Sequence, residues 1–266
     1  MNSKRPGNTK KYGTLWTGTC NIVLPFTKSA FPGPFRQQTR LAYYASLFNT
    51  VEINSSFYKV PRPVTFEKWS QEVPNGFRFA VKLWRNITHT PALAFKRHDV
   101  DFFMKAANQA DDAKKGCLLI QFPAGLKVNF AVRVETLLKQ LQEQDPQGRW
   151  HKCVEFRDNG WYNPDVYAML DRYSASLVLQ DMPASALYAL HTRRGPVYLR
   201  FHGLKGDYRG TYDIEVLRDY GHRINQWLVQ GKDVYAYFNN TIGNAFDNAR
   251  SLQELVAVQA GGGKAV

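Results

Sequence analysis

In several short segments that are predicted to be buried strands, charged or polar residues alternate with apolar ones. Charged side chains are rarely buried in a globular protein. In one run, Glu155 and Arg157 alternate with Val154 and Phe156. Because a buried charge without a partner is costly, such side chains must pair with one another, bind a ligand, or do both. The side chains predicted to share this inward-facing position are Glu52, Asn54, Ser56, Lys82, Gln121, Cys153, Glu155, Arg157, Gln180, Tyr198, Arg200, His202, Tyr235, Tyr237, Asn239, and Thr17 or Thr19.

The charges of this set favour an anionic ligand. Lys82, Arg157 and Arg200 are cations, and they outnumber the carboxylates Glu52 and Glu155. Ammonium and guanidinium groups bind phosphate and carboxylate through charge-assisted hydrogen bonds. We therefore predict that the three cations hold a phosphate-bearing or other anionic ligand.

Four residues are candidates for acid–base chemistry. Glu52 and Glu155 are predicted to transfer protons, with His202 or His89 as the partner. The set lacks the excess of carboxylates and histidines that a hydrolytic multi-metal centre needs, so no metal and no cofactor are predicted. A single divalent ion on Glu155, Asp181 and His202 is the alternative.

Two loops near the end of the chain resemble phosphate-binding segments. Residues 203–212 contain three glycines with Lys205 and Arg209, and Asn240 and Asn244 lie in a loop that leads into a helix. Backbone N–H groups at a helix N-terminus bind phosphate, although a flexible turn with an ordinary helix cap explains the same residues. The predicted ligand-binding residues are Asn54, Tyr58, Lys82, Gln121, Arg157, Asp181, Arg200, Lys205, Asn239, Asn240 and Asn244.

Eight apolar runs must position these residues, and helical segments separate most of them. This alternation predicts an α/β fold with a parallel sheet, and the count and length are those of a (β/α)8 TIM barrel. The alternative is an open doubly wound sheet, but no glycine-rich fingerprint follows the first run. The predicted strands are Leu15–Ile22, Thr50–Tyr58, Arg78–Trp84, Gly116–Phe122, Lys152–Arg157, Ser176–Asp181, Val197–His202 and Asp233–Asn239.

The helices are predicted from apolar positions three and four residues apart and from proline or asparagine at their starts. The segment at Ala184–Leu190 carries the weakest signal. The predicted helices are Arg36–Phe48, Pro63–Glu72, Val100–Ala113, Phe130–Gln144, Pro164–Tyr173, Ala184–Leu190, Ile214–Gln230 and Ala245–Gln259. Strand ends carry the active sites of such barrels, so the candidate residues are expected to meet at the carboxyl ends of the strands.

Length and composition favour one domain. The 266 residues are 44% hydrophobic, enough for a single core. We predict a flexible basic arm at residues 1–13, the barrel at 14–258 and a flexible tail at 259–266.

No long apolar window predicts a membrane span, and the polar amino terminus is not a secretory signal, so a cytoplasmic location is expected. The three cysteines are expected to be small buried residues of a reducing compartment.

The net charge of +13 adds a second class of partner. A basic surface attracts phosphate-bearing molecules, including nucleic acid, although no dense run of lysine and arginine marks a nucleic-acid arm. The partner is therefore predicted to be an anionic small molecule or a nucleic acid. The sequence leaves the oligomeric state and the existence of catalysis open.

Several segments together resemble the YecE-like family, domain of unknown function 72. They are Thr50–Tyr58 with Pro61 and Trp69, Phe79–Lys82 with Ile87–His89, Val154–Arg157 with Trp161, Tyr198–Gly203, and Tyr237–Asn240 with Ala245 and Asn248. The resemblance implies a TIM barrel but no activity. Such barrels are similar to those of sugar isomerases and of an endonuclease that cuts at abasic sites, which makes metal-assisted phosphodiester hydrolysis a further alternative.

Overall fold

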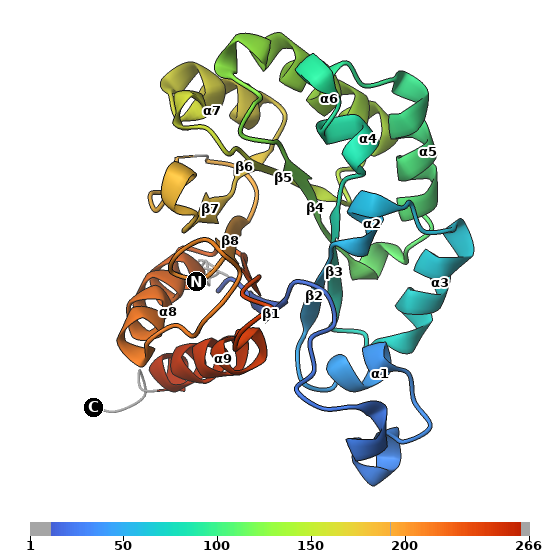
Figure 1. Ribbon diagram of the computed structural model, residues 1–266, viewed down its shortest axis with the longest axis vertical. Coiled ribbons are helices and arrows are strands. Elements are labelled where there is room, and N and C mark those ends of the chain that lie inside the picture. Colours follow the sequence, from blue (N-terminus) through green and yellow to red (C-terminus); the bar gives the residue numbers. More distant parts are fainter. Residues whose placement is uncertain (1–11, 192, 262–266) are drawn as a thin grey trace, which may run out of the picture.

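Strands and helices alternate along the chain in the computed structural model, which describes residues 12–191 and 193–261 (Figure 1). Most of the predicted basic arm and part of the predicted tail lie outside the described residues. Helix α9, Ala245–Gly261, continues past residue 258, where the barrel was predicted to end.

The strands form two sheets. Within each sheet, neighbouring strands pair in parallel. One sheet has the order β1-β9-β8-β7 and the other the order β2-β3-β4-β5-β6. A parallel bridge between Cys20 and Glu52 links β1 to β2, and only Val178 separates β6 from β7. The strands are β1 Leu15–Thr19, β2 Thr50–Ile53, β3 Arg78–Lys82, β4 Lys115–Gln121, β5 His151–Glu155, β6 Ser176–Leu177, β7 Leu179–Gln180, β8 Val197–Phe201 and β9 Val234–Phe238.

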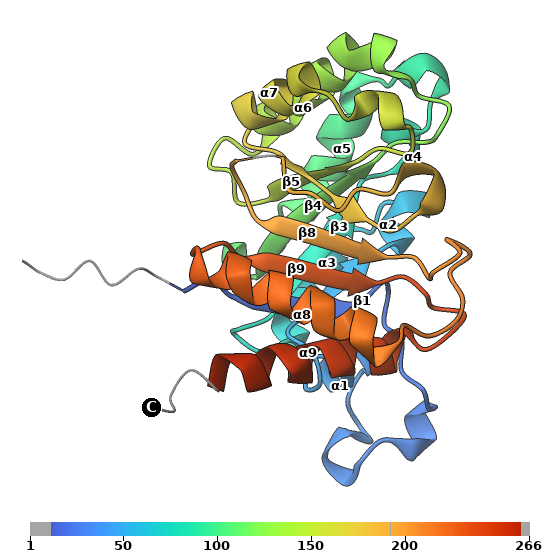
Figure 2. The same cartoon turned by 90° about the vertical axis from the view of Figure 1, so that its left-hand side faces the viewer.

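The helices α3, α6, α7 and α8 begin and end close to their predicted limits. Helix α3 begins at Pro63, and the Asn163 side chain caps α7 by accepting a hydrogen bond from the N–H of Val166. In Figure 2, α8 and α9 lie side by side; both pack against β9, and α9 also packs against β1. The α-helices are α1 Arg40–Tyr44, α2 Ser55–Tyr58, α3 Pro63–Glu72, α4 Arg85–Thr88, α5 Arg97–Ala107, α6 Ala131–Gln144, α7 Pro164–Arg172, α8 Ile214–Val229 and α9 Ala245–Gly261.

Several predicted elements differ from the structure. The first predicted strand ends at Thr19, the helix predicted at Arg36–Phe48 covers only Arg40–Tyr44, and the one predicted at Val100–Ala113 is Arg97–Ala107. The second predicted strand ends at Ile53, because the chain turns at once into the helix α2. The sixth predicted strand is split into β6 and β7. The helix predicted at Ala184–Leu190 is wrong: a short 3-10 turn at Pro183–Ser185 leads into Leu187, which pairs with Gln180 through two backbone hydrogen bonds of 2.8 and 3.0 Å.

Alternate strand residues belong to two different cores, as their polarity predicted. Val51, Ile53 and Val154 pack with the helices in the larger core. The smaller core contains strand residues and their immediate neighbours but no helix residue, so the strands enclose it. Its members are Trp16, Cys20, Ala80, Cys117, Leu119, Cys153, Val178, Tyr198, Tyr235 and Tyr237. Towards the carboxyl ends of the strands, these inward positions become polar or charged.

The prediction for β1 is wrong, because Trp16 and Cys20 rather than Thr17 or Thr19 belong to the enclosed core. The ring of Trp16 stacks on that of Tyr235 at 5.7 Å between centroids. Thr19 instead contacts the Tyr44 hydroxyl through its own Oγ1 at 3.0 Å. A threonine whose hydroxyl finds a partner can lie on the helix-facing side, so polarity alone misassigned this strand.

Side chains complete the junction between β1 and β2. The Tyr44 hydroxyl accepts a hydrogen bond of 2.7 Å from the N–H of Thr19, and Asn49 Oδ1 accepts one of 3.0 Å from the N–H of Thr17.

The chain is one α/β domain with parallel strands, consistent with a TIM barrel. Within the described residues, no helix has the length and apolar character needed to cross a membrane.

Candidate functional site

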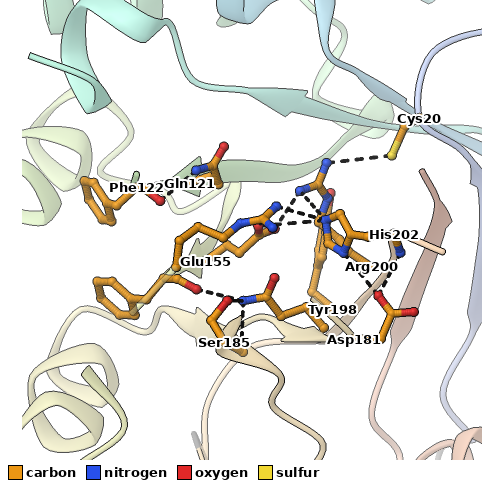
Figure 3. Close-up of polar contacts among 12 residues, drawn as sticks. Cys20, Gln121, Phe122, Glu155, Asp181, Ser185, Tyr198, Arg200 and His202 are labelled. Atoms are coloured by element: carbon orange, nitrogen blue, oxygen red, sulfur yellow. Dashed lines mark hydrogen bonds and ion pairs between the residues drawn. The ribbon is translucent and has the colours of Figure 1, made fainter. Parts of the chain in front are cut away.

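Arg200, on β8, is the centre of a buried network of charges (Figure 3). Its Nε and Nη2 donate to the two oxygens of Glu52, at 3.0 and 2.8 Å. Glu52 also accepts hydrogen bonds from the Tyr198 hydroxyl at 2.6 Å and from the Cys20 thiol at 2.9 Å. Both side chains of this bidentate pair are buried, so it is formed at the cost of desolvating both ions.

Glu155, on β5, is the second carboxylate bound to the same guanidinium. Arg200 Nη1 donates to Glu155 Oε2 at 2.6 Å. The other oxygen, Oε1, forms an ion pair with Arg157 Nη2, although the geometry is not that of a hydrogen bond. Arg200 is therefore neutralised within the protein and has little free charge to offer a ligand.

His202 connects this network to Asp181. Its Nε2 lies 3.0 Å from Arg157 Nη2 and 3.2 Å from Arg200 Nη1, and both guanidinium groups can only donate. We therefore assign Nε2 as the acceptor and place the proton on Nδ1, which lies 3.3 Å from Asp181 Oδ1. The Tyr212 hydroxyl donates to the other oxygen of Asp181.

The network keeps both glutamates ionised. Burial acts to raise the pKa of Glu52, but Arg200 and the hydrogen bonds from Cys20 and Tyr198 lower it further than burial raises it. Burial also acts to raise the pKa of Glu155, and Arg157 and Arg200 outweigh it. Neither glutamate lines the cavity above the network, so the structure places both predicted proton-transfer carboxylates beneath the cavity wall.

A cavity of 320 Å³ lies above the network, at the carboxyl ends of the strands. Its wall combines cations and side-chain amides with aromatic and aliphatic groups. Its lining residues are Asn21, Asn54, Phe57, Tyr58, Lys82, Gln121, Arg157, Arg200, Tyr208, Asn239, Thr241 and Ile242. Seven of the predicted ligand-binding residues are in this set.

Lys82 is the cation of this wall that lacks a carboxylate partner among the residues that the structure describes. Its Nζ lies 4.2 Å from the centroid of the Phe57 ring, a cation–π contact. Burial and the charge of Arg200 lower the pKa of Lys82 to about 8. An ammonium group in this position can accept an anion or give up its proton near neutral pH.

Four predicted ligand-binding residues are not among those that line the cavity: Asp181, which contacts His202, and three residues of the two loops. Asn240 is buried, and its Nδ2 donates to Gly210 O and Asn248 Oδ1, each at 2.9 Å. Asn244 donates to Thr211 Oγ1 at 2.6 Å, and Lys205 is exposed in the loop after β8. These residues of the two loops are thus part of the rim structure and not of the cavity wall.

The sequence prediction missed several wall residues, among them Asn21, Tyr208 and Ile242. Asn21 and Tyr208 adopt left-handed backbone conformations, with φ of 61° and 64°. Asn21 Oδ1 accepts a hydrogen bond of 3.0 Å from the N–H of Asn54, which fixes the loop after β1 beside that after β2. An asparagine directly after a strand was the available signal for this residue.

A larger hollow of 940 Å³ lies between α7 and the segment that precedes β8. It contains Asp171, Arg172 and Arg193, and the Tyr167 and His191 rings stack there at 4.4 Å. It is at the amino ends of the strands, and Arg172 already pairs with a carboxylate of α6. We therefore assign the candidate site to the smaller cavity, which adjoins the buried network.

Among residues 12–191 and 193–261, no group of three or more His, Cys, Asp or Glu side chains is arranged to hold a metal ion. The alternative ligand set of Glu155, Asp181 and His202 is interrupted by Arg157 and Arg200, whose guanidinium groups face the imidazole Nε2. The residues at this position thus do not fit a divalent metal site.

Comparison with known proteins identifies the family. Residues 18–264 match the family model described as "Protein of unknown function DUF72". The chain belongs to the DUF72 family. The resemblance noted in the sequence is thereby confirmed, and it extends over almost the whole chain.

Relatives in DUF72 share the fold at low sequence identity. The UPF0759 protein YunF of Bacillus subtilis (strain 168) is 25% identical over 273 residues, covering 88% of this chain and 92% of YunF. A solved DUF72 structure from Enterococcus faecalis V583 has a TM-score of 0.75 and 20% identity, covering 92% of this chain and 96% of the other. One from Thermotoga maritima MSB8 has a TM-score of 0.69 and 22% identity, covering 92% and 99%.

A more distant likeness extends beyond DUF72. The solved structure of SacUVDE, a UV damage endonuclease, has a TM-score of 0.57 and 9% identity, covering 94% of this chain and 99% of the other. At this identity the likeness concerns the fold alone.

Acid is expected to destabilise the protein before its carboxylates titrate. His89 lies 4.8 Å from the Phe57 ring, and burial with the charge of Lys82 lowers its pKa to about 4. Burial and Arg200 also lower the pKa of His202. A depressed histidine pKa stabilises the fold above the unfolded value of about 6.5, and this stability is lost as the pH falls below it.

The His89→Gln variant separates the two histidines. Between pH 7 and pH 5 the free energy of unfolding of the wild type should fall, and the variant should lose about 1 kcal/mol less, a value discounted because His89 is partly exposed. Urea unfolding at both pH values measures the difference. Equal losses in the two proteins would show that His89 does not contribute.

Proposed function

We propose that this protein binds a small phosphorylated or other anionic ligand in the 320 Å³ cavity. The observation that carries the proposal is Lys82, a cation of the cavity wall with no carboxylate partner among the described residues. The other cations of the wall, Arg157 and Arg200, are engaged by Glu155 and Glu52. An anion in the cavity would supply the charge that the protein does not supply to Lys82.

The surrounding residues support this role. Arg157 lines the cavity with a side chain that is 12% exposed, so part of its guanidinium can contact a ligand directly. The amides of Asn54, Gln121 and Asn239 offer neutral donors and acceptors for the rest of the ligand. Glu52 and Glu155 act as positioning residues in this proposal, because they hold the guanidinium groups in place from below.

Inorganic phosphate is the simplest probe of this function. Phosphate that binds the native state should raise the melting temperature, and above the dissociation constant the rise should grow with the logarithm of the phosphate concentration. The Lys82→Met variant keeps the length of the side chain and removes its charge. Loss of one charge-assisted hydrogen bond, about 1.5–3 kcal/mol, corresponds to binding weakened roughly 10- to 100-fold.

The control is Lys105→Met, which removes an exposed lysine on α5. Thermal melts and calorimetric titrations of the three proteins should give the same phosphate affinity for the wild type and the control, and a weaker one for Lys82→Met. Equal affinity in all three, or no phosphate-dependent stabilisation of the wild type, would contradict the proposal.

We further propose that the strands that carry the cavity form a closed (β/α)8 barrel. The bridge between Cys20 and Glu52, with Tyr44 and Asn49 beside it, supports closure on one side. On the other side β6 and β7 are parts of one extended segment, because only Val178 separates them. The TM-scores of 0.75 and 0.69 with the two DUF72 structures support the same arrangement.

Two other functions have less support. The net charge of +13 favours a nucleic-acid partner, but the residues that line the cavity form a small enclosure and not an extended groove. Metal-assisted phosphodiester hydrolysis would need a donor set that the described residues do not provide. The similarity to SacUVDE adds no residues to either function.

A further inference from the structure

The amine of Lys82 is held rigidly at the cavity. Its strand, β3, pairs on both sides, with β2 and with β4. The backbone carbonyl of Lys82 accepts a hydrogen bond of 2.7 Å from the Ser56 hydroxyl, which fixes the end of the strand. The Phe57 ring lies against Nζ. A side chain on such a rigid element keeps a constant position relative to a bound ligand.

Lys82 also differs chemically from the other cations of the wall. Guanidinium groups only donate hydrogen bonds, and those of Arg157 and Arg200 are fixed by Glu155 and Glu52. Burial of Nζ, and after it the charge of Arg200, disfavour the ammonium form, and no carboxylate among the described residues bonds to Nζ in return. Such surroundings favour the neutral amine, which is the nucleophilic form. The pKa of about 8 agrees with this reasoning.

Hydrogen-bonding groups for a reacting carbonyl lie in the same wall. Asn54, Gln121 and Asn239 line the cavity with Lys82. Gln121 Nε2 donates to Phe122 O at 2.7 Å, and Asn54 Oδ1 is buried without a hydrogen-bond partner among the described residues. A buried amide oxygen of this kind can accept from the hydroxyl of an addition intermediate.

We propose that Lys82 is a nucleophilic amine that condenses with the aldehyde or ketone group of an anionic substrate. The proposal rests on the proposed anion-binding function, and Arg157 holds the anionic group while Nζ meets the carbonyl carbon. The Nζ lone pair forms the C–N bond as the C=O π bond opens. Both hydrogens of the amine leave with the carbonyl oxygen as water, and an imine remains on Lys82. No oxidant or reductant takes part.

A counter-ion role for Lys82 and its carbonyl chemistry are compatible, because near its pKa of about 8 both the ammonium form and the neutral amine are populated. The ammonium form attracts the anion into the cavity, as the proposed function requires. A permanent cation would suffice for that role alone, whereas only a neutral amine can attack a carbonyl carbon.

Pyridoxal 5′-phosphate is a suitable probe, because it carries both an aldehyde and a phosphate. The intact protein is treated with the probe and then with borohydride, which reduces any imine to a stable amine, and the modified lysine is located by peptide mass spectrometry. Lys82 should be modified at least tenfold faster than Lys105, with a half-maximal rate near pH 8. Ordinary exposed lysines titrate near 10.4.

Matched variants complete the test. Lys105→Met should keep the fast reaction and Lys82→Met should lose it, while inorganic phosphate should slow the reaction at Lys82 in the wild type. If phosphate stabilises the wild type but Lys82 reacts no faster than Lys105, the nucleophile is refuted and the anion site stands. If phosphate neither stabilises the protein nor protects Lys82, the anion site fails and this inference fails with it.

Discussion

Replacing Arg200 with leucine should lower the free energy of unfolding by about 3–5 kcal/mol, because it leaves two buried carboxylates without their common partner. Arg200 forms a bidentate pair with Glu52 and a further bond to Glu155 Oε2. Both carboxylates are fully buried, so water cannot replace the lost guanidinium. Glu52 must then stay charged without a cationic partner or take up a proton, and Glu155 keeps only Arg157.

Two comparison variants make this result specific. Arg97→Leu removes an exposed arginine that pairs with Glu143 at 2.8 Å, and it should change stability by less than about 1 kcal/mol. Adding Glu52→Gln and Glu155→Gln to Arg200→Leu removes the unpaired charges, and much of the stability should return. Urea unfolding measures all four proteins. If the triple variant is less stable than Arg200→Leu, stranded charge is not the cause of the loss.

Filling the interior with this network of charges costs free energy, because the ions must be desolvated. Apolar residues of similar volume often stabilise a protein as well as a buried ion pair does. The interior already contains such residues nearer the amino ends of the strands, where the Tyr198 and Tyr235 rings stack at 6.4 Å. Charged residues take the place of apolar and aromatic ones only near the cavity. A network in that place can hold the cationic side chains of the cavity wall, which is the role proposed for Glu52 and Glu155.

Strand parity gave most of this arrangement from the sequence. Apolar neighbours of Glu52, Glu155 and Arg200 predicted that all three side chains face the enclosed side, and they do. The pattern succeeds there because the other face of each strand must be apolar to pack with helices. It failed on β1, where Thr17 and Thr19 find partners for their backbone N–H groups in the side chains Asn49 and Tyr44.

The partners of each charge could not be predicted. Arg200 was expected to hold the ligand, but its carboxylates lie 148 and 45 residues away in the sequence. The alternation of side chains along a strand predicts which face of the sheet a side chain lies on. It does not predict which side chain of another strand it will contact. The loops were less predictable still, because the contacts of Asn240 with Gly210 and Asn248 depend on how two loops pack.

Gly18→Ala is expected to destabilise the protein by about 3 kcal/mol, although it adds only a methyl group. Gly18 lies on β1 at the junction with β2. A Cβ there would be closer to the Thr50 carbonyl oxygen than real Cβ atoms come, and 2.8 Å from the Tyr44 hydroxyl. The backbone cannot withdraw, because β1 is paired with β9 on its other side. The strand junction would have to open to admit the methyl group.

Gly76→Ala is the matched control, since nothing lies within 4 Å of a Cβ at that position. It should leave stability unchanged or raise it by about 0.4–1 kcal/mol, because alanine restricts the unfolded chain. Chemical denaturation of both variants gives the comparison. Equal stabilities would mean that β1 and β2 can separate freely, and closure of the barrel at this junction would have to be abandoned. A large loss confined to Gly18→Ala would instead support a tight junction directly beside Glu52, the residue that fixes Arg200 beneath the cavity.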